Sequence, residues 1–241
     1  MYIGMYKLVW KEEFDEDGLL DTNEWEYYSG CPHPEGGELE NYMIESINNS
    51  FVKDGKLYIR AIKEETEAGE YTSAKVRTKR SWKYGKFEIR AKIPIEKGTW
   101  PAIWMLPKGA KEEDWPLCGE IDIMEHVAQN LGQVHFSLHT KKYNWLRENK
   151  YTNITQLKEK VYDFNLYTMI WEEDEIRILI NNKLCYQERL LEKKTKEVWP
   201  FDKEFYLIFS LAVGGWGGLN GLSDKWPQDF IIDYVKIYQK S

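Results

Sequence analysis

Three carboxylates gather in one short segment, residues 119–125, which reads GEIDIME. Side chains alternate between the two faces of a β-strand, so Glu120 and Asp122 share a face. Glu125 would fall on the opposite, apolar face. One extra residue, a β-bulge near Met124, returns it to the face of the other two acids. The segment therefore predicts three acids on one face of a bulged strand.

Crowded carboxylates repel one another, so at least one pKa in this group should rise. A bland ion-pair or surface role remains an alternative for any acid triplet. The chemistry that requires two carboxylates is glycoside hydrolysis. With retention of configuration, one carboxylate attacks the anomeric carbon and the other moves the proton, and the two lie about 5–5.5 Å apart. Two glutamates on one bulged strand suit that distance better than the wider gap of an inverting pair.

Composition favours a single globular domain with an uncharged partner. The chain has 241 residues, of which 42% are apolar and 30% charged, with a net charge of −7 and no basic block. Nucleic acid is therefore a poor partner, and no segment is long and apolar enough to span a membrane. Cys31, Cys118 and Cys185 are sparse and odd in number, which predicts free thiols rather than a disulfide framework or a zinc site.

A period of two dominates the hydrophobic pattern. Residues 86–93 place Phe87, Ile89, Ala91 and Ile93 on one face, as in a half-buried strand. Strands are also expected at residues 57–62, 175–180, 205–211 and 231–238, with a tight hairpin at residues 181–182. Short helical turns are expected at residues 154–160 and 199–202. Many short strands with few helices predict an all-β sandwich of two antiparallel sheets, formed by residues 1–241 as one domain.

Aromatic residues are unusually abundant, with 11 Trp and 16 Tyr. Trp100 and Trp104 share one face of their expected strand, so both are placed to stack on successive sugar rings. Trp115 lies just before the acid strand and is expected to line the same cleft. For each ring, a place in the core remains the alternative.

Several segments resemble glycoside hydrolase family 16, and in particular its laminarinase branch. The resemblance rests on residues 115–126 (WPLCGEIDIMEH), 98–107, 82–92, 211–215 and 233–238. It implies a jelly-roll sandwich whose concave sheet holds a glucan in a cleft, and endo-cleavage of β-1,3-glucan with retention. By position, Glu120 would be the nucleophile, Glu125 the acid/base, and Asp122 the partner of the nucleophile. Glu125 must then begin protonated while Glu120 is ionised.

The resemblance extends to binding residues and departs at two places, residues 36–37 and residues 216–218. It favours His139 as a substrate-binding residue in the cleft. It also suggests a structural calcium at Asp233, with backbone ligands from Glu13 and Gly55, although the chemistry requires no cofactor. Family members usually carry asparagines where residues 36–37 are both glycine, which leaves one sugar subsite unassigned.

The sequence leaves several other functions open. Mixed-linkage β-1,3-1,4-glucan or a galactan would be alternative substrates on the same fold. A glucan-binding module without catalysis would be expected to lose one of the glutamates, and a partner-binding sandwich leaves the acid strand unexplained. The expected partner is a polysaccharide or oligosaccharide, and the expected state is a monomer. The resemblance implies an extracellular enzyme, while no export signal is visible, so an intracellular location stays open.

Overall fold

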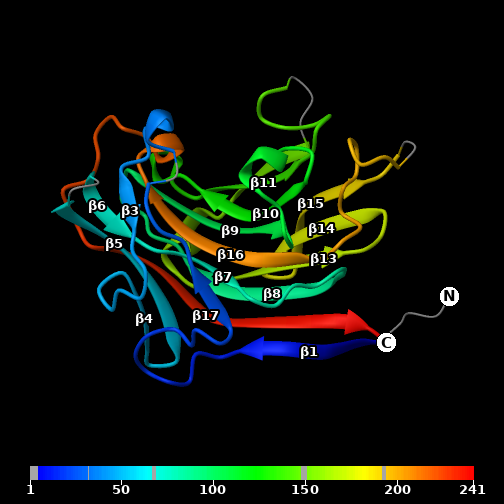
Figure 1. Cartoon of the computed structure of the whole chain (residues 1–241), viewed down its shortest axis with the longest axis horizontal. Helices are drawn as coiled ribbons and strands as arrows, with labels where there is room; N and C mark the ends of the chain where they lie inside the picture. Colours follow the sequence, from blue (N-terminus) through cyan, green and yellow to red (C-terminus); the bar gives the residue numbers. More distant parts are fainter. Residues whose placement is uncertain (1–4, 32, 67–68, 148–150, 192–193) are drawn as a thin grey trace.

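The computed structural model describes residues 5–31, 33–66, 69–147, 151–191 and 194–241. Within them the strands form two sheets that face each other, with β9, β10 and β11 above β8, β17 and β1 in Figure 1. The β10 sheet runs in the order β12 (Tyr151–Gln156), β11 (Gln133–His139), β10 (Glu120–His126), β9 (Thr99–Pro107), β16 (Phe205–Val213), β7 (Lys75–Thr78), β2 (Trp25–Tyr27).

The opposite sheet is built around the last strand, β17 (Gln228–Lys240). Its order is β15 (Lys183–Arg189), β14 (Glu175–Ile180), β13 (Asn165–Trp171), β8 (Gly85–Lys92), β17, β5 (Lys56–Thr66), β6 (Gly69–Ser73), β3 (Glu40–Tyr42), with β1 (Tyr6–Glu12) beside β17 and β4 (Ser50–Lys53) beside β5. All pairs are antiparallel except β3 with β6. Five short 3-10 turns are described: η1 (Pro34–Gly36), η2 (Glu112–Asp114), η3 (Ala128–Asn130), η4 (Lys158–Tyr162) and η5 (Gly215–Gly217). The all-β sandwich expected from the sequence is confirmed.

Alternation decides which side of each strand faces the core. In β8 the residues are alternately buried and half-buried, as the sequence predicts for a strand with one covered face. The hairpin between β14 and β15 turns on Asn181 and Asn182, whose φ angles are 50° and 65°. Two consecutive positive φ angles define the tight turn that matches the twist of a hairpin.

Both expected helical turns are wrong in detail. Residues 154–156 belong to strand β12, in which Ile154 lies opposite His135 of β11, and η4 begins only at Lys158. Pairing with the open edge of β11 therefore overrides the local helical pattern. Residues 199–202 are irregular, because Trp199 and Phe201 are held by burial in the core rather than by a helix.

Large rings fill the space between the sheets. Trp171 packs edge-on against Phe205 with ring centroids 5.3 Å apart, and Trp25 lies 5.6 Å from Phe209. Trp25 and Trp171 are fully buried, so for these tryptophans the core alternative is correct. All three cysteines are free thiols, as predicted, with Cys118 buried.

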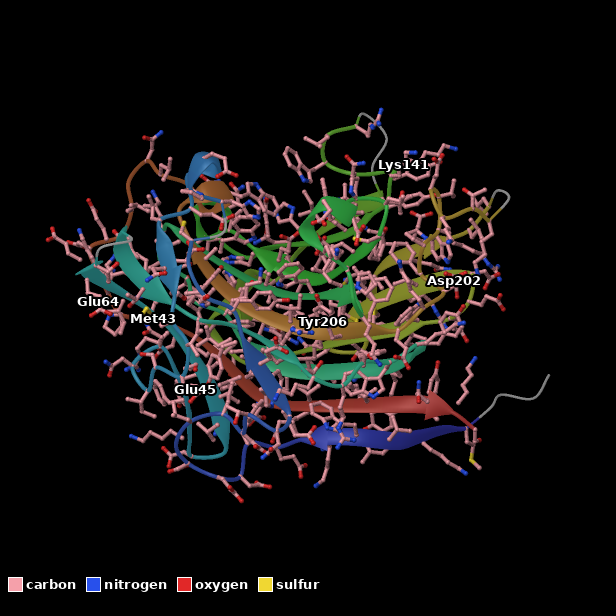
Figure 2. The ribbon with its side chains drawn as sticks, in the orientation of Figure 1. Met43, Glu45, Glu64, Lys141, Asp202 and Tyr206 are labelled. Carbon is pink, nitrogen blue, oxygen red and sulfur yellow. The ribbon has the colours of Figure 1, made fainter. Side chains whose placement is uncertain are left out.

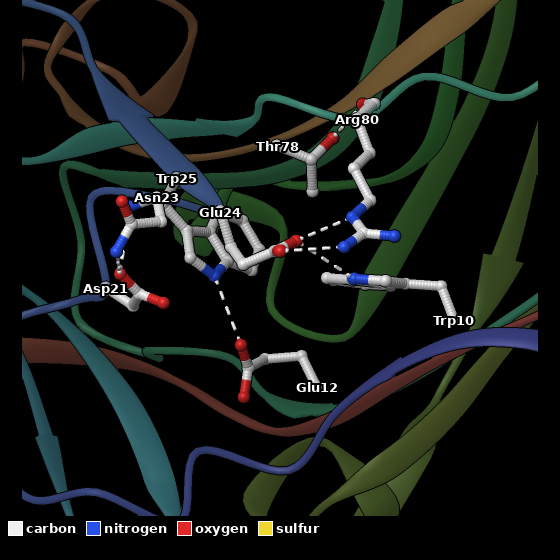
Figure 3. A network of polar contacts seen from close by, with 8 residues as sticks. All are labelled: Trp10, Glu12, Asp21, Asn23, Glu24, Trp25, Thr78 and Arg80. Atoms are coloured by element: carbon white, nitrogen blue, oxygen red, sulfur yellow. Dashed lines mark hydrogen bonds and ion pairs between the residues drawn. The ribbon is translucent and has the colours of Figure 1, made fainter.

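Carboxylates at one rim of the sandwich satisfy the N–H groups of two packed indoles (Figure 3). Trp10 Nε1 donates to Glu24 Oε2 at 3.2 Å, and Trp25 Nε1 donates to Glu12 Oε2 at 3.4 Å. Arg80 also clamps Glu24 through two hydrogen bonds of 2.8 and 2.9 Å. The network ties β1 and β2 to the chain that follows β7, so the N-terminal strand is fixed to both sheets. In the part of the chain that the structure describes, no helix has the length and apolarity to cross a membrane.

Candidate active site

A β-bulge in β10 brings the three acids to one face of the β10 sheet, as the sequence predicts. Asp122 lies opposite Trp104 of β9, and Glu125 lies opposite Ala102. The two residues between the acids, Ile123 and Met124, thus face a single residue of β9, and both are fully buried in the core. The extra residue restores Glu125 to the face of Glu120 and Asp122, called the acid face below.

Strand β11 lines the acid face with polar side chains. Its register places them in order against the acids: His139 opposite Glu120, Ser137 opposite Asp122 and His135 opposite Glu125. The His139 Nε2 atom lies 3.1 Å from Asp122 Oδ2 and 3.8 Å from Glu120 Oε1. His139 therefore contacts Asp122 and lies close to Glu120 on the acid face.

The predicted tryptophans border the same acids. Trp100 Nε1 donates a 3.1 Å hydrogen bond to Glu125 Oε1. Trp104 Nε1 donates to Ser210 Oγ at 3.1 Å. The Trp115 ring centroid lies 5.9 Å from that of His139. None of these three tryptophans is fully buried, so their rings stay available at the acid face.

Burial is the main influence on the protonation of the acids. It raises the pKa of Glu120 to about 8, with a further contribution from the charge of Asp122, and it raises the pKa of Asp122 to about 7. The pKa of Glu125 is raised well above its ordinary value, first by burial and then by the charge of Asp122. Three buried acids so close together cannot all ionise at neutral pH, so they titrate as a group. Burial therefore favours the protonated form of Glu125.

Three further side chains at the acid face were not assigned from the sequence. Trp216 of η5 lies 5.7 Å from Trp100 and 4.7 Å from His135, between ring centroids. Lys75 of β7 has its Nζ 4.6 Å from the Trp104 ring centroid. Trp145, in the loop after β11, lies 6.2 Å from Trp115. The alternation of Lys75 with Val76 in residues 75–78 is the one local signal that could have placed any of them.

This arrangement, with an acid pair, a supporting aspartate and surrounding indoles, has counterparts among known proteins. The profile of glycosyl hydrolases family 16 matches residues 40–236. The chain belongs to this family. It is therefore a glycoside hydrolase, and the resemblance stated from the motifs is confirmed.

Individual relatives of this family 16 enzyme cover nearly the whole chain. A β-glucanase of Rhodothermus marinus is 42% identical over 97% of the chain and 85% of its own length. The solved laminarinase of Rhodothermus marinus superposes with a TM-score of 0.93 at 40% identity, covering 100% of both chains. A keratan-sulfate endo-1,4-β-galactosidase of Sphingobacterium multivorum is 36% identical over 97% of the chain, which spans 55% of that protein.

The glycine pair at residues 36–37 lies at the border of the acid face. Gly37 has a φ of 81°, and its carbonyl accepts a 2.7 Å hydrogen bond from the Gly215 N–H. A Cβ on Gly37 would lie 3.0 Å from Leu219. The glycine pair, where the resemblance led us to expect asparagines, therefore lies beside η5, the turn that carries Trp216.

The residues expected to hold calcium offer a poor donor set. The carboxylate of Asp233 forms an ion pair with Arg90 across β17 and β8. A cation at this position would have to displace a guanidinium, and calcium prefers six or more oxygen ligands. The structure thus does not fit a ready calcium site at Asp233. Calcium stays a prediction that metal analysis of the purified protein tests.

Proposed function

We propose that this family 16 enzyme is an endo-acting hydrolase of β-1,3-glucan that retains anomeric configuration. The observation that carries the proposal is the bulged strand, which puts Glu120, Asp122 and Glu125 together on the acid face, with Trp100 hydrogen-bonded to Glu125. A module that only bound sugar would have no need for three mutually repelling buried acids.

In the proposed first step, Glu120 attacks the anomeric carbon while Glu125 protonates the oxygen of the departing sugar. The bond from the anomeric carbon to that oxygen breaks, and a glycosyl ester forms on Glu120. Glu125, now ionised, then takes a proton from water, and the resulting hydroxide displaces Glu120 from the sugar. Both acids return to their starting forms.

Asp122 supports the nucleophile in this scheme. Glu120 must attack as an anion, although burial raises its pKa to about 8. Burial also raises the pKa of Asp122, so the two carboxyls can share one proton, which moves to Asp122 when Glu120 attacks. The His139 Nε2 atom lies 3.1 Å from Asp122 Oδ2, within ion-pair distance of that carboxyl. Glu125 meanwhile stays protonated, as a general acid requires.

The relatives support the choice of glucan and name its rival. The β-glucanase and the laminarinase of Rhodothermus marinus are both at least 40% identical to the chain. The galactosidase of Sphingobacterium multivorum, at 36% identity, makes a galactan the second candidate. Polymeric glucans are too large to enter a cell intact, so we also propose that the enzyme acts outside it. Activity in the culture medium rather than the cell lysate is the expected result.

A side-by-side assay on laminarin, a mixed-linkage glucan and a galactan tests the substrate. We expect laminarin to be cleaved fastest, with internal products from the start of the reaction. NMR of the first products should show the β-anomer before mutarotation. Release from the galactan but not from laminarin would overturn the choice of glucan, and an initial α-anomer would overturn retention.

The variant Glu120→Gln tests the assigned nucleophile. It should lose nearly all turnover, a fall of at least about 10³-fold, while it still binds laminarin. Glu35→Gln, which alters an exposed glutamate on η1, is the control and should keep full activity. Full activity in Glu120→Gln would rule out the mechanism.

A further inference from the structure

Two tryptophans stand out by their exposure. All 11 lie within the described part of the chain, and of these only Trp145, at 62%, and Trp216, at 41%, are strongly exposed. An exposed indole gains nothing from burial in the folded protein, so a large exposed ring near a functional site indicates binding. Trp216 touches His135 and Trp100, beside Glu125. Trp145 has no role in the mechanism above.

The turn that carries Trp145 is firmly built. Thr140 and Asn144 are buried, at 0% and 2% exposure. The Asn144 side chain donates to the Thr140 carbonyl at 2.9 Å and accepts from the Leu146 N–H at 3.0 Å. The Tyr143 N–H donates to Thr140 Oγ1 at 2.9 Å. Hydrogen bonds on both sides of Trp145 thus fix the backbone that carries its ring.

Packing anchors this turn to its surroundings. Tyr143 stacks on Tyr151 of β12 with ring centroids 4.0 Å apart, and the Lys142 N–H donates to the Glu197 carbonyl at 2.9 Å. Figure 2 shows the loop standing above the sheets, with Lys141 labelled at its start. The exposure of Trp145 is therefore a feature of an anchored turn.

The ring of Trp145 continues a row that starts at the acids. Its centroid lies 6.2 Å from that of Trp115, with the two planes 34° apart. Trp115 in turn lies 5.9 Å from His139, whose Nε2 is 3.1 Å from Asp122. Only two ring contacts separate Trp145 from a residue that touches the acids. A sugar near the reacting unit can reach it.

We propose that Trp145 and Trp115 form a sugar-binding platform on the Glu120 side of the acids, which holds a neighbouring unit of the same polymer. The inference rests on the proposed function, because the occupant is a glucosyl unit of the β-glucan being cleaved. A β-glucose ring carries its hydroxyls around the edge and leaves C–H groups on its faces, so it can stack on an indole. The pair, whose ring planes are tilted by 34°, offers an apolar surface that is continuous with the acid face.

The variant Trp145→Ala tests the platform through a split between KM and kcat. Binding at this position is the same before and during the reaction, so its loss should raise KM for laminarin and leave kcat nearly unchanged. We expect an increase in KM of about fivefold to thirtyfold, the range for one lost stacking contact. Trp145→Phe should recover most of the wild-type KM, because it keeps a flat ring.

A matched control comes from the same turn. Leu146 is 61% exposed, like its neighbour, but has no ring. Leu146→Ala should therefore leave both constants unchanged. Binding of laminarin to Glu120→Gln, with and without Trp145→Ala, gives the affinity without turnover and should show the same loss.

The two proposals fail in different ways. If wild-type protein cleaves laminarin and Trp145→Ala has the wild-type KM, the platform is wrong and the proposed function stands. If the wild-type protein does not cleave laminarin, the proposed function is wrong. The platform is then judged by the affinity of Trp145→Ala for whichever polysaccharide of the panel the wild-type protein binds, and an unchanged affinity overturns it.

Discussion

Trp100 opposes the rise that burial causes in the pKa of Glu125. Its Nε1–H donates to Glu125 Oε1, and a hydrogen bond to the charged carboxylate lowers the pKa that burial raises. A buried acid without this donor would keep its proton to higher pH. One indole therefore tunes the second half of the reaction, in which Glu125 must be ionised to accept a proton from water.

Trp100→Phe should move the alkaline limb of the pH–kcat profile to higher pH, by up to about one unit. The sign follows because the lost donor favours the ionised form, so the pKa of Glu125 rises further. The profile of kcat from pH 5 to pH 10 measures the shift. Trp104→Phe is the control, since Trp104 donates to Ser210 and not to an acid. An equal shift in both variants would contradict this assignment.

At the scale of the strand, the number of residues between Asp122 and Glu125 decides which face of β10 Glu125 occupies. Ile123 and Met124 together face one residue of β9, so β10 contains one residue more than its neighbour. Removing that residue gives a regular strand in which the two glutamates and the aspartate still alternate onto one face. Removing two residues puts the second glutamate on the core face.

Deleting Met124 should therefore preserve measurable laminarin cleavage, whereas deleting residues 123–124 should abolish it. Both deletions lose buried side chains from the core, and the first should cost about 2–5 kcal/mol of stability. Activity assays and thermal unfolding on both proteins separate the two effects. A folded but inactive Met124 deletion would show that the bulge itself, beyond the shared face, is required.

Glu40 of β3 and Glu38, two residues before that strand, form a second pair of crowded acids. Glu40 is fully buried, and its Oε2 accepts a 2.8 Å hydrogen bond from the Val213 N–H of β16. Its Oε1 has no hydrogen-bond partner among the described residues. Burial, followed by the charge of Glu40, raises the pKa of Glu38 to about 7. Burial also raises the pKa of Glu40 itself.

Glu40→Gln should raise the melting temperature by a few degrees at pH 8 and change it little at pH 5. When an acid has a higher pKa in the folded state than in the unfolded state, the protein loses stability as pH rises through the folded-state pKa. Glutamine keeps the acceptor for Val213 and carries no charge at any pH. Thermal unfolding at the two pH values is the measurement, with the exposed Glu35→Gln as control. A variant less stable than wild type at pH 8 would show that the carboxylate is needed as an anion.

For the whole molecule, two populations of carboxyls set the pH range of stability. Buried acids at and near the acid face have raised pKa values: Glu38, Glu40, Glu120, Asp122 and Glu125. Rim and surface acids with hydrogen-bond or ion-pair partners have lowered ones, among them Glu24 beside Arg80 and Glu172 beside Lys240. Ionisation of the first group destabilises the protein as pH rises, and protonation of the second group destabilises it as pH falls.

The melting temperature should therefore be highest near about pH 5 and fall toward pH 8, through the raised pKa values of about 7 and about 8. Each kcal/mol lost from the free energy of unfolding lowers the melting temperature by about 2–4 °C in a chain of this size. Calorimetry at unit steps of pH gives the curve. The double variant Glu40→Gln, Asp122→Asn should flatten the descent above pH 5. A melting temperature that climbs from pH 5 to pH 8 in the wild type would refute this account.

Much of the architecture and the reactive centre could be predicted from local sequence. Alternation at residues 86–93 gave β8, and the spacing of Glu120, Asp122 and Glu125 required the bulge that β10 contains. Both inferences need only the geometry of one strand. The helical turn expected at residues 154–160 failed because a neighbouring strand edge, β11, decides that conformation.

Contacts between distant segments account for what could not be predicted. Lys75 meets Trp104 and Tyr28 only after β7, β9 and β2 are assembled into one sheet. Trp145 meets Trp115 across a loop, 30 positions along the chain. No periodic pattern in the sequence links residues so far apart. Their place at the acid face follows instead from the order of the strands in the sheet.

The position of β17 bears on how the protein is made. This strand, residues Gln228–Lys240, is hydrogen-bonded to β8, β5 and β1, so the last strand of the chain occupies the middle of its sheet. A growing polypeptide at the ribosome exposes the apolar faces of β5 and β8 until residue 240 has emerged. This sheet can then fold only once residue 240 has left the ribosome, and a chaperone that shields these strands would protect the nascent chain from aggregation.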